Sequence, residues 1–315
     1  MTTTESGLPQ LRGGLFLSDG GLETTLVFQR GIPLPHFAAF VLLGDPTGRQ
    51  VLAEYFKPYL ALAARTPGAG FVLETPTWRA NADWGAKLGF DAAGLAAVNR
   101  DAATFVRQLQ KTWAPRIEGE VVTAGVIGPR GDGYVAEEPG SIDEAARYHQ
   151  PQAEALREGG VEMLIAVTMT GSAEACGVAR AAAAVGLPCV VSFTLETDGR
   201  LPSGETLGEA IVRVDGDGHP PAYFQLNCAH PSHFENVLAD GAAWRERIRG
   251  LRANASTKSH AELDASTAID SGDPEDLGRR YLRLRAPLSR LNVLGGCCGT
   301  DERHLRAIAR AWTSG

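Results

Sequence analysis

Short apolar runs alternate with helix-like stretches along almost the whole chain, and this alternation restricts the possible folds more than any other feature. We expect eight of these runs to be strands: 15–18, 71–73, 121–126, 163–167, 189–193, 223–226, 248–253 and 291–294. The segments between them have apolar residues at helical spacing: 51–65, 92–113, 142–157, 173–185, 205–214, 234–239 and 274–289. Strands that alternate with helices predict the α/β class, and eight such units predict a (β/α)8 barrel, the TIM barrel.

The doubly wound parallel sheet is the competing α/β fold, and the chain lacks its signature. No G-x-G-x-x-G phosphate-binding turn follows the first expected strand, which ends in Asp19-Gly20-Gly21. No linker, repeat array or charge block divides the sequence. We therefore expect a single barrel domain over residues 11–315, preceded by a disordered tail over residues 1–10.

Composition narrows the classes of function and partner. The formal net charge of −7 and the lack of a Lys/Arg run argue against nucleic acid as the main partner. No apolar stretch is long enough to cross a bilayer, and the N-terminus lacks the hydrophobic core of a signal peptide. We therefore expect a cytoplasmic monomer or small homo-oligomer with no membrane partner. In a reducing compartment, the five cysteines would stay free to bind metal.

Two adjacent cysteines, Cys297 and Cys298, lie in a glycine turn between the last expected strand and the last helix. Helix signals follow them, with Thr300 as the expected N-cap. Glycines let the backbone turn tightly, so neighbouring sulfurs can face one centre. A third thiol, Cys228, ends the sixth expected strand. Three thiolates would bind a zinc ion and leave its fourth position open for a substrate.

The barrel fold would bring these thiols together. The carboxyl ends of all barrel strands meet at one face, and neighbouring strands lie about 4.8 Å apart. Cys228 and the Cys297–Cys298 pair follow strands six and eight, so one metal ion can bridge them. Other polar residues at expected strand ends share this face: Asp19, Glu74, Thr168, Glu196, Asn227 and Asn254.

Some polar side chains near these motifs have more than one interpretation. His230 and His233 follow Cys228 closely, but three thiols already satisfy zinc, so we expect loop or helix-capping roles for both. We expect His304, on the last helix, to lie at the surface. The loop over residues 130–141 is either solvated surface or a lid, and the sequence leaves both possibilities open.

Six motifs along the chain match one known family. They are Asp19-Gly20-Gly21-Leu22-Glu23-Thr24, Glu74-Thr75-Pro76-Thr77-Trp78-Arg79-Ala80-Asn81, Gly128-Pro129, Ser192-Phe193-Thr194, Asn227-Cys228 and Gly295-Gly296-Cys297-Cys298-Gly299-Thr300. With these motifs the chain resembles the homocysteine S-methyltransferase family over almost its whole length.

The resemblance implies a (β/α)8 barrel with Cys228, Cys297 and Cys298 as zinc ligands. It also implies methyl transfer to homocysteine, which gives methionine and so places the protein in methionine biosynthesis. Donors in the family include S-methylmethionine, S-adenosylmethionine, betaine and, in larger modular enzymes, methyl-folate by way of cobalamin. The residues expected to contact the substrates are Asp19, Gly20, Gly21, Glu23, Glu74, Thr75, Arg79, Val167, Thr168 and Asn227.

The chemistry of a three-thiolate zinc site fits this reaction. A free alkyl thiol has a pKa of about 8.5, and binding to Zn²⁺ converts it to a thiolate at neutral pH. The three protein thiolates keep the substrate sulfur electron-rich, so it can attack a methyl group on a sulfonium or ammonium donor. Aromatic rings such as Trp78 or Phe28 would hold that cation by their faces.

Two positions depart from the family pattern. Relatives usually carry a Glu at the end of strand four that holds the α-ammonium of the acceptor, whereas this chain has Val167, and Arg79 replaces an aromatic found in some relatives. We therefore hypothesise a thiol acceptor without an α-amino group. In a weaker version homocysteine remains the acceptor, and its ammonium is held by Glu23, Glu74 or Glu196.

Two further functions stay open at this level. The first is a barrel that holds zinc and a thiol or sulfonium metabolite without turnover. The second is a methyl-transfer half-reaction that feeds a corrinoid partner, which would require a second protein because the chain has no cobalamin or folate module.

Overall fold

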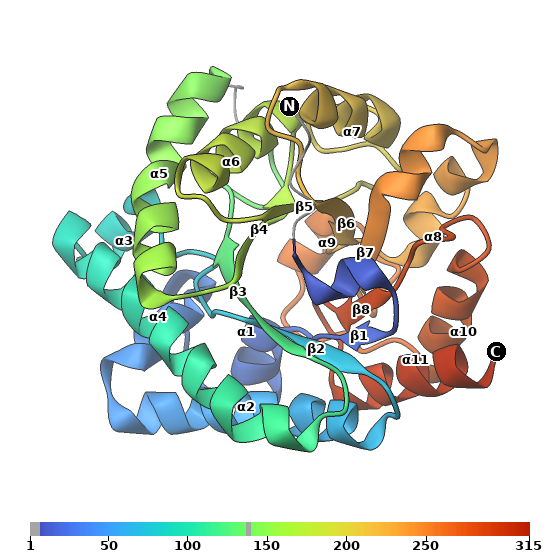
Figure 1. Ribbon diagram of the computed structural model, residues 1–315, viewed down its shortest axis with the longest axis horizontal. Coiled ribbons are helices and arrows are strands. Elements are labelled where there is room, and N and C mark those ends of the chain that lie inside the picture. The colour runs from blue at the N-terminus through green and yellow to red at the C-terminus, as the bar shows by residue number, and fades with distance from the viewer. Residues whose placement is uncertain (1–6, 137–139) are drawn as a thin grey trace.

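The protein is an eight-stranded parallel barrel. The computed structural model describes residues 7–136 and 140–315, and the helices surround the strands (Figure 1). The strands are β1 Phe16–Leu17, β2 Gly70–Glu74, β3 Val121–Ile127, β4 Met163–Met169, β5 Cys189–Phe193, β6 Tyr223–Asn227, β7 Ile248–Ala253 and β8 Val293–Gly296. Each pairs with the next, and β1 closes the ring by pairing with both β2 and β8. The predicted (β/α)8 barrel is therefore confirmed, and the doubly wound sheet is excluded.

The helices follow the strands in sequence, and the longer ones cover the outside of the barrel. They are α1 Leu22–Thr24, α2 Pro46–Arg65, α3 Ala82–Lys87, α4 Ala92–Trp113, α5 Ile142–Gly159, α6 Ser172–Ala184, α7 Leu207–Gly216, α8 Pro231–Phe234, α9 His260–Asp264, α10 Pro274–Leu284 and α11 Glu302–Ser314. No helix in the described part of the chain is both long and apolar enough to cross a membrane.

Side-chain caps explain where several helices begin. Ser141, Thr206 and Ser259 each accept from the backbone three residues on and form capping boxes at α5, α7 and α9. The expected N-cap of the last helix was wrong by one residue. Asp301 caps α11, whereas the Thr300 hydroxyl donates to the Cys297 carbonyl at 2.7 Å. Thr and Asp are both good N-cap residues, but the Thr300 hydroxyl is already bonded within the cysteine turn, so Asp301 forms the cap.

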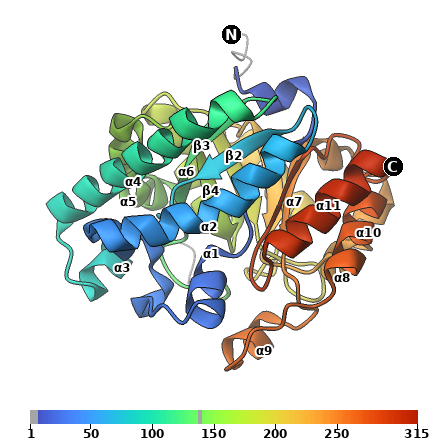
Figure 2. The same cartoon turned by 90° about the horizontal axis from the view of Figure 1, so that it is seen from below.

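The start of the chain corrects another expectation. Residues 1–6 lie outside the described part, but residues 8–10, expected to be disordered, are ordered against the barrel. Pro9–Arg12 is a 3₁₀ helix, Leu8 is buried, and Gln10 is fully buried with Nε2 at 3.2 Å from Met163 Sδ. Met163 begins β4, so this segment covers the amino-terminal end of the barrel. Figure 2 shows the N-terminus at one end of the molecule and α9 at the other.

Apolar side chains fill the barrel on both sides of its strands. Inside, Val72, Ile165 and Val190 pack with Tyr223 and Phe16 in a closed cluster. Outside, a larger cluster joins the strands to the surrounding helices. Because burial on both faces removes the alternation of polar residues, the strands appear in the sequence as continuous apolar runs.

Candidate metal and substrate site

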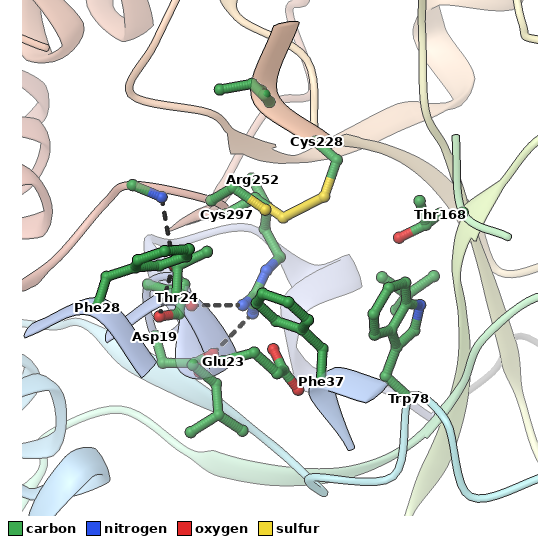
Figure 3. A pocket seen from close by; sticks show the side chains of 18 of the residues that line it. Asp19, Glu23, Thr24, Phe28, Phe37, Trp78, Thr168, Cys228, Arg252 and Cys297 are labelled. Carbon is green, nitrogen blue, oxygen red and sulfur yellow. Dashed lines mark hydrogen bonds and ion pairs between the residues drawn. A yellow bond between two sulfur atoms is a disulfide. The ribbon is translucent and has the colours of Figure 1, made fainter. Parts of the chain in front are cut away.

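Three cysteines meet at the carboxyl-terminal face of the barrel. The Sγ atoms of Cys228, Cys297 and Cys298 lie within 4.8 Å of one another, and the group could hold a metal ion. In this structure a disulfide joins Cys228 to Cys297, with Cα atoms 5.4 Å apart, and Cys298 is free (Figure 3). Three thiolates suit a soft or borderline ion. Because thiolates, not disulfide sulfurs, bind such an ion, metal binding requires reduction of this bond.

The backbone around Cys228 is held in an unusual conformation. Its φ of 53° lies in the left-handed region, which is costly for a residue with a side chain. Two side chains hold its carbonyl: Asn254 Nδ2 donates to it at 3.0 Å and His260 Nε2 at 2.8 Å. These bonds turn the chain at the end of β6 and bring the sulfur to the cysteines after β8.

Tyr134 reaches the cysteines from the loop that follows β3. Its hydroxyl lies 3.3 Å from the Cys298 sulfur, and its ring stacks on His260 with centroids 4.2 Å apart. Burial raises the pKa of the Cys298 thiol, the contact with Tyr134 lowers it, and the charge of Glu23 raises it again. The net pKa is raised, so in the metal-free protein Cys298 is held as a thiol. Residues 137–139 of the loop lie outside the described part.

Arg252 lines the pocket and was not predicted from the sequence. It comes from β7 and is buried, with its Nη1 at 2.8 Å from Asp19 Oδ1 and 2.7 Å from Glu74 Oε1. Tyr55 donates to the other oxygen of Asp19 at 2.9 Å. Burial raises the pKa of Glu74, while Arg252 opposes that rise. The single guanidinium thus balances one of the two carboxylate charges at the ends of β1 and β2.

Arg79 lies at the wall of the pocket, and its charge is already engaged. Its guanidinium carbon is 4.6 Å from the ring centroid of Trp78 and 3.8 Å from that of Trp84. It also donates to the carbonyl of His36 and lies 3.8 Å from a carboxylate oxygen of Asp132. Arg79 therefore braces the segment that precedes α2 against the loop after β3.

One pocket contains the three cysteines and all the predicted substrate contacts except Asn227 (Figure 3). Asn227 is buried and instead bonds to Thr168 and Ser192. Glu196, one of the polar strand-end residues, does not line this pocket and pairs with His260 at 3.0 Å. Asn254 does not line the pocket either, so three of the six polar strand-end residues, Asp19, Glu74 and Thr168, contribute to it.

The expectation for His230 is confirmed, and the expectation for His304 is wrong. His230 caps α8, as expected, because its ring accepts from the Ser232 amide. His304 is fully buried, not at the surface, and its Nε2 lies 2.7 Å from the carbonyl of Ser271. Ser271 lies in the segment before α10, so the sequence of α11 alone does not reveal this contact.

These features define a parallel (β/α)8-barrel protein with a three-cysteine site at its carboxyl face. Among solved structures it resembles the homocysteine methyltransferase MmuM from Escherichia coli. The oxidised form is 21% identical with a TM-score of 0.73, covering 96% of this chain and 98% of that one. The metallated form is 20% identical with a TM-score of 0.71, covering 95% and 96%.

The model of the homocysteine S-methyltransferase family matches residues 16–312. The chain therefore belongs to the homocysteine S-methyltransferase family. It is a methyltransferase enzyme, and this membership sets aside the alternative of a barrel that binds without turnover.

Proposed function

We propose that this protein transfers a methyl group from a sulfonium or ammonium donor to a thiol in a zinc-dependent reaction. The simplest acceptor is homocysteine, with methionine as the product. One observation carries the proposal: three cysteine sulfurs lie within 4.8 Å of one another in the pocket that contains the predicted substrate contacts.

The cysteines would act as metal ligands after reduction of the Cys228–Cys297 disulfide. When bound, zinc would lower the pKa of the incoming thiol so that it reacts as a thiolate. The protein supplies the orientation of the ligands. Asn254 and His260 fix the carbonyl of Cys228, and Tyr134 meets the sulfur of Cys298.

The balance of the reaction explains why the donor is a cation. The acceptor sulfur uses a lone pair to form the new bond to the methyl carbon. The bond between that carbon and the donor heteroatom breaks, and its electron pair returns to the heteroatom, which loses its positive charge. A pocket that holds carboxylates and aromatic rings stabilises such a donor. Phe28 and Phe37, 39% and 37% exposed, line this pocket.

The residue at position 167 favours a second class of thiol acceptor. Val167, near the end of β4, presents an apolar side chain to the pocket and offers nothing to an ammonium group. The second candidate is therefore a mercapto-acid without an α-amino group.

The test uses reduced, zinc-loaded protein and two acceptors, homocysteine and its deaminated analogue 4-mercaptobutanoate. Each is incubated with S-methylmethionine, S-adenosylmethionine or betaine, and the methylated thiol is measured by mass spectrometry. We expect transfer from at least one donor. Cys298→Ser should lose both metal and activity, whereas Cys176→Ser, at a buried position outside the pocket, should keep both. Full metal content in Cys298→Ser would contradict the assignment.

A further inference from the structure

The carboxylates that line the deep part of the pocket differ in their partners. Asp19 is bound by Arg252 and Tyr55, and Glu74 is bound by Arg252. Glu23, on α1, lines the same pocket. Within the described residues its carboxylate has no hydrogen bond or ion pair to another side chain, and its polar contact is with its own backbone amide. Glu23 is therefore a half-buried carboxylate without a counter-ion.

The charges of Arg79 and Arg252 reach Glu23 and lower its pKa, but within the described residues neither guanidinium forms an ion pair with it. Arg252 donates to Asp19, Glu74 and Ser18. Arg79 stacks between two indole rings and donates to a backbone carbonyl. A carboxylate placed in such surroundings is costly unless a positive group comes to it. Glu23 is thus available to a positive group that enters the pocket.

Glu23 also has the right position for a ligand that reaches the cysteines. It is close enough to Cys298 for its charge to act on that thiol, and Figure 3 shows it between Asp19 and Phe37, below the Cys228–Cys297 bond. The ring of Phe37 pairs with that of Phe28, with centroids 6.3 Å apart. Glu23 therefore shares one pocket with the two aromatic rings and the three sulfurs.

We propose that Glu23 binds the positively charged group of a substrate and so determines which compounds enter the site. This inference rests on the proposed methyl transfer. Two sources share the required chemistry: the α-ammonium of an amino-acid acceptor and the onium centre of the methyl donor. Of the three carboxylates considered for the ammonium, Glu74 is paired with Arg252 and Glu196 with His260, so Glu23 is the one left available.

The experiment measures dissociation constants by calorimetry for wild-type protein, Glu23→Gln and the control Glu154→Gln. Glu154 is exposed on α5, so its substitution removes the same charge far from the pocket. The probes are homocysteine, 4-mercaptobutanoate, S-methylmethionine and dimethylsulfoniopropionate, which is a sulfonium without an amino group. Thermal unfolding of each variant checks that the fold is intact.

We expect Glu23→Gln to weaken the binding of the cationic probes by roughly tenfold to a hundredfold and to leave the binding of 4-mercaptobutanoate unchanged. Weaker binding of homocysteine and S-methylmethionine alone would show that Glu23 binds the α-ammonium group, because both compounds carry that group. Weaker binding of both sulfonium compounds, with homocysteine binding unchanged, would show that Glu23 binds the onium centre of the donor. Equal loss for all four probes, no loss for any, or no binding of any cationic probe by the wild type overturns the proposal.

The inference and the proposed function can fail separately. If wild-type protein methylates homocysteine and Glu23→Gln does so with the same KM values, only the inference fails. If cationic probes bind through Glu23 but no donor and thiol pair gives a methylated product, only the methyl-transfer proposal fails.

Discussion

Asn227 holds Thr168 across the end of the barrel by two hydrogen bonds. Its Nδ2 donates to the Thr168 hydroxyl at 2.8 Å, and its Oδ1 accepts from the Thr168 amide at 3.0 Å. Thr168 has a φ of 62°, a left-handed conformation that is strained for a β-branched residue. Asn227 therefore shapes the pocket wall from behind while the residue after it, Cys228, supplies a sulfur.

Replacing Asn227 by Ala should release this strained turn. We expect the free energy of unfolding to fall by about 2 kcal/mol, because three buried hydrogen bonds are lost, and substrate affinity to fall as well. The matched control is Asn292→Ala, a buried asparagine that bonds to Gln10 and Gly14 at the other end of the barrel. Urea unfolding should show a loss for both variants. An equal loss of thiol affinity in both would contradict the local role.

Replacing Arg252 by Met should destabilise the protein more than any surface charge change. Removing the guanidinium leaves Asp19 and Glu74 buried together without a counter-ion, which costs about 3–5 kcal/mol. Adding Glu74→Gln to this variant should recover part of the loss. The control is Arg100→Met, which breaks an exposed pair with Glu158 and should change stability by at most about 1 kcal/mol. Similar urea midpoints for the two single variants would show that the buried network is not stabilising.

Tyr134→Phe should weaken metal retention without disturbing the fold. The variant loses the 3.3 Å contact between the hydroxyl and the Cys298 sulfur but keeps the ring stacked on His260. Hydrogen bonds to ligating groups typically change metal affinity about tenfold or more. Chelator competition on reduced protein measures this change, and Tyr148→Phe, which loses a hydroxyl outside the cysteine pocket, is the control. If Tyr134→Phe bound zinc as tightly as the wild type, the contact between Tyr134 and Cys298 would matter only in the metal-free protein.

The sequence predicts the barrel well because the barrel depends on local patterns, and its topology then places Cys228 beside the Cys297–Cys298 pair. Apolar runs mark strands, and glycines around Cys297 and Cys298 mark a turn at a strand end. Arg252 could not be predicted in this way. A charged residue inside a strand acquires its partners only when the barrel closes and brings β7 beside β8 and near β1 and β2.

Asn227 shows that the sequence can also predict a substrate contact for a residue that does not line the pocket. Its position at the end of β6 favoured a substrate contact, but its side chain turns to Thr168 two strands away. What decides this is the left-handed backbone of Thr168, which no local sequence signal announces for a threonine. Long-range contacts that offset local strain are the part of the site that needs the structure.

The last prediction concerns pH and Glu23. Burial is the main cause that raises the pKa of Glu23 from 4.5 to about 7. The folded protein then binds this proton more tightly than the unfolded chain does. The resulting stability is fully present below about pH 4.5 and is lost as the pH rises through about 7, so the free energy of unfolding should fall over that range.

Glu23→Gln removes the titrating group and should remove that part of the pH dependence. At about pH 8 we expect the variant to be more stable than the wild type, by an amount on the order of 1 kcal/mol once solvent screening is considered. At about pH 4.5 the two should be nearly equal, because the carboxyl is then mostly protonated. Urea unfolding of metal-free, ligand-free protein at both pH values tests this, with Glu154→Gln as the control for an exposed charge. A variant less stable than the wild type at about pH 8 would mean that Glu23 has a counter-ion in solution, and the free carboxylate on which the cation site depends would be lost.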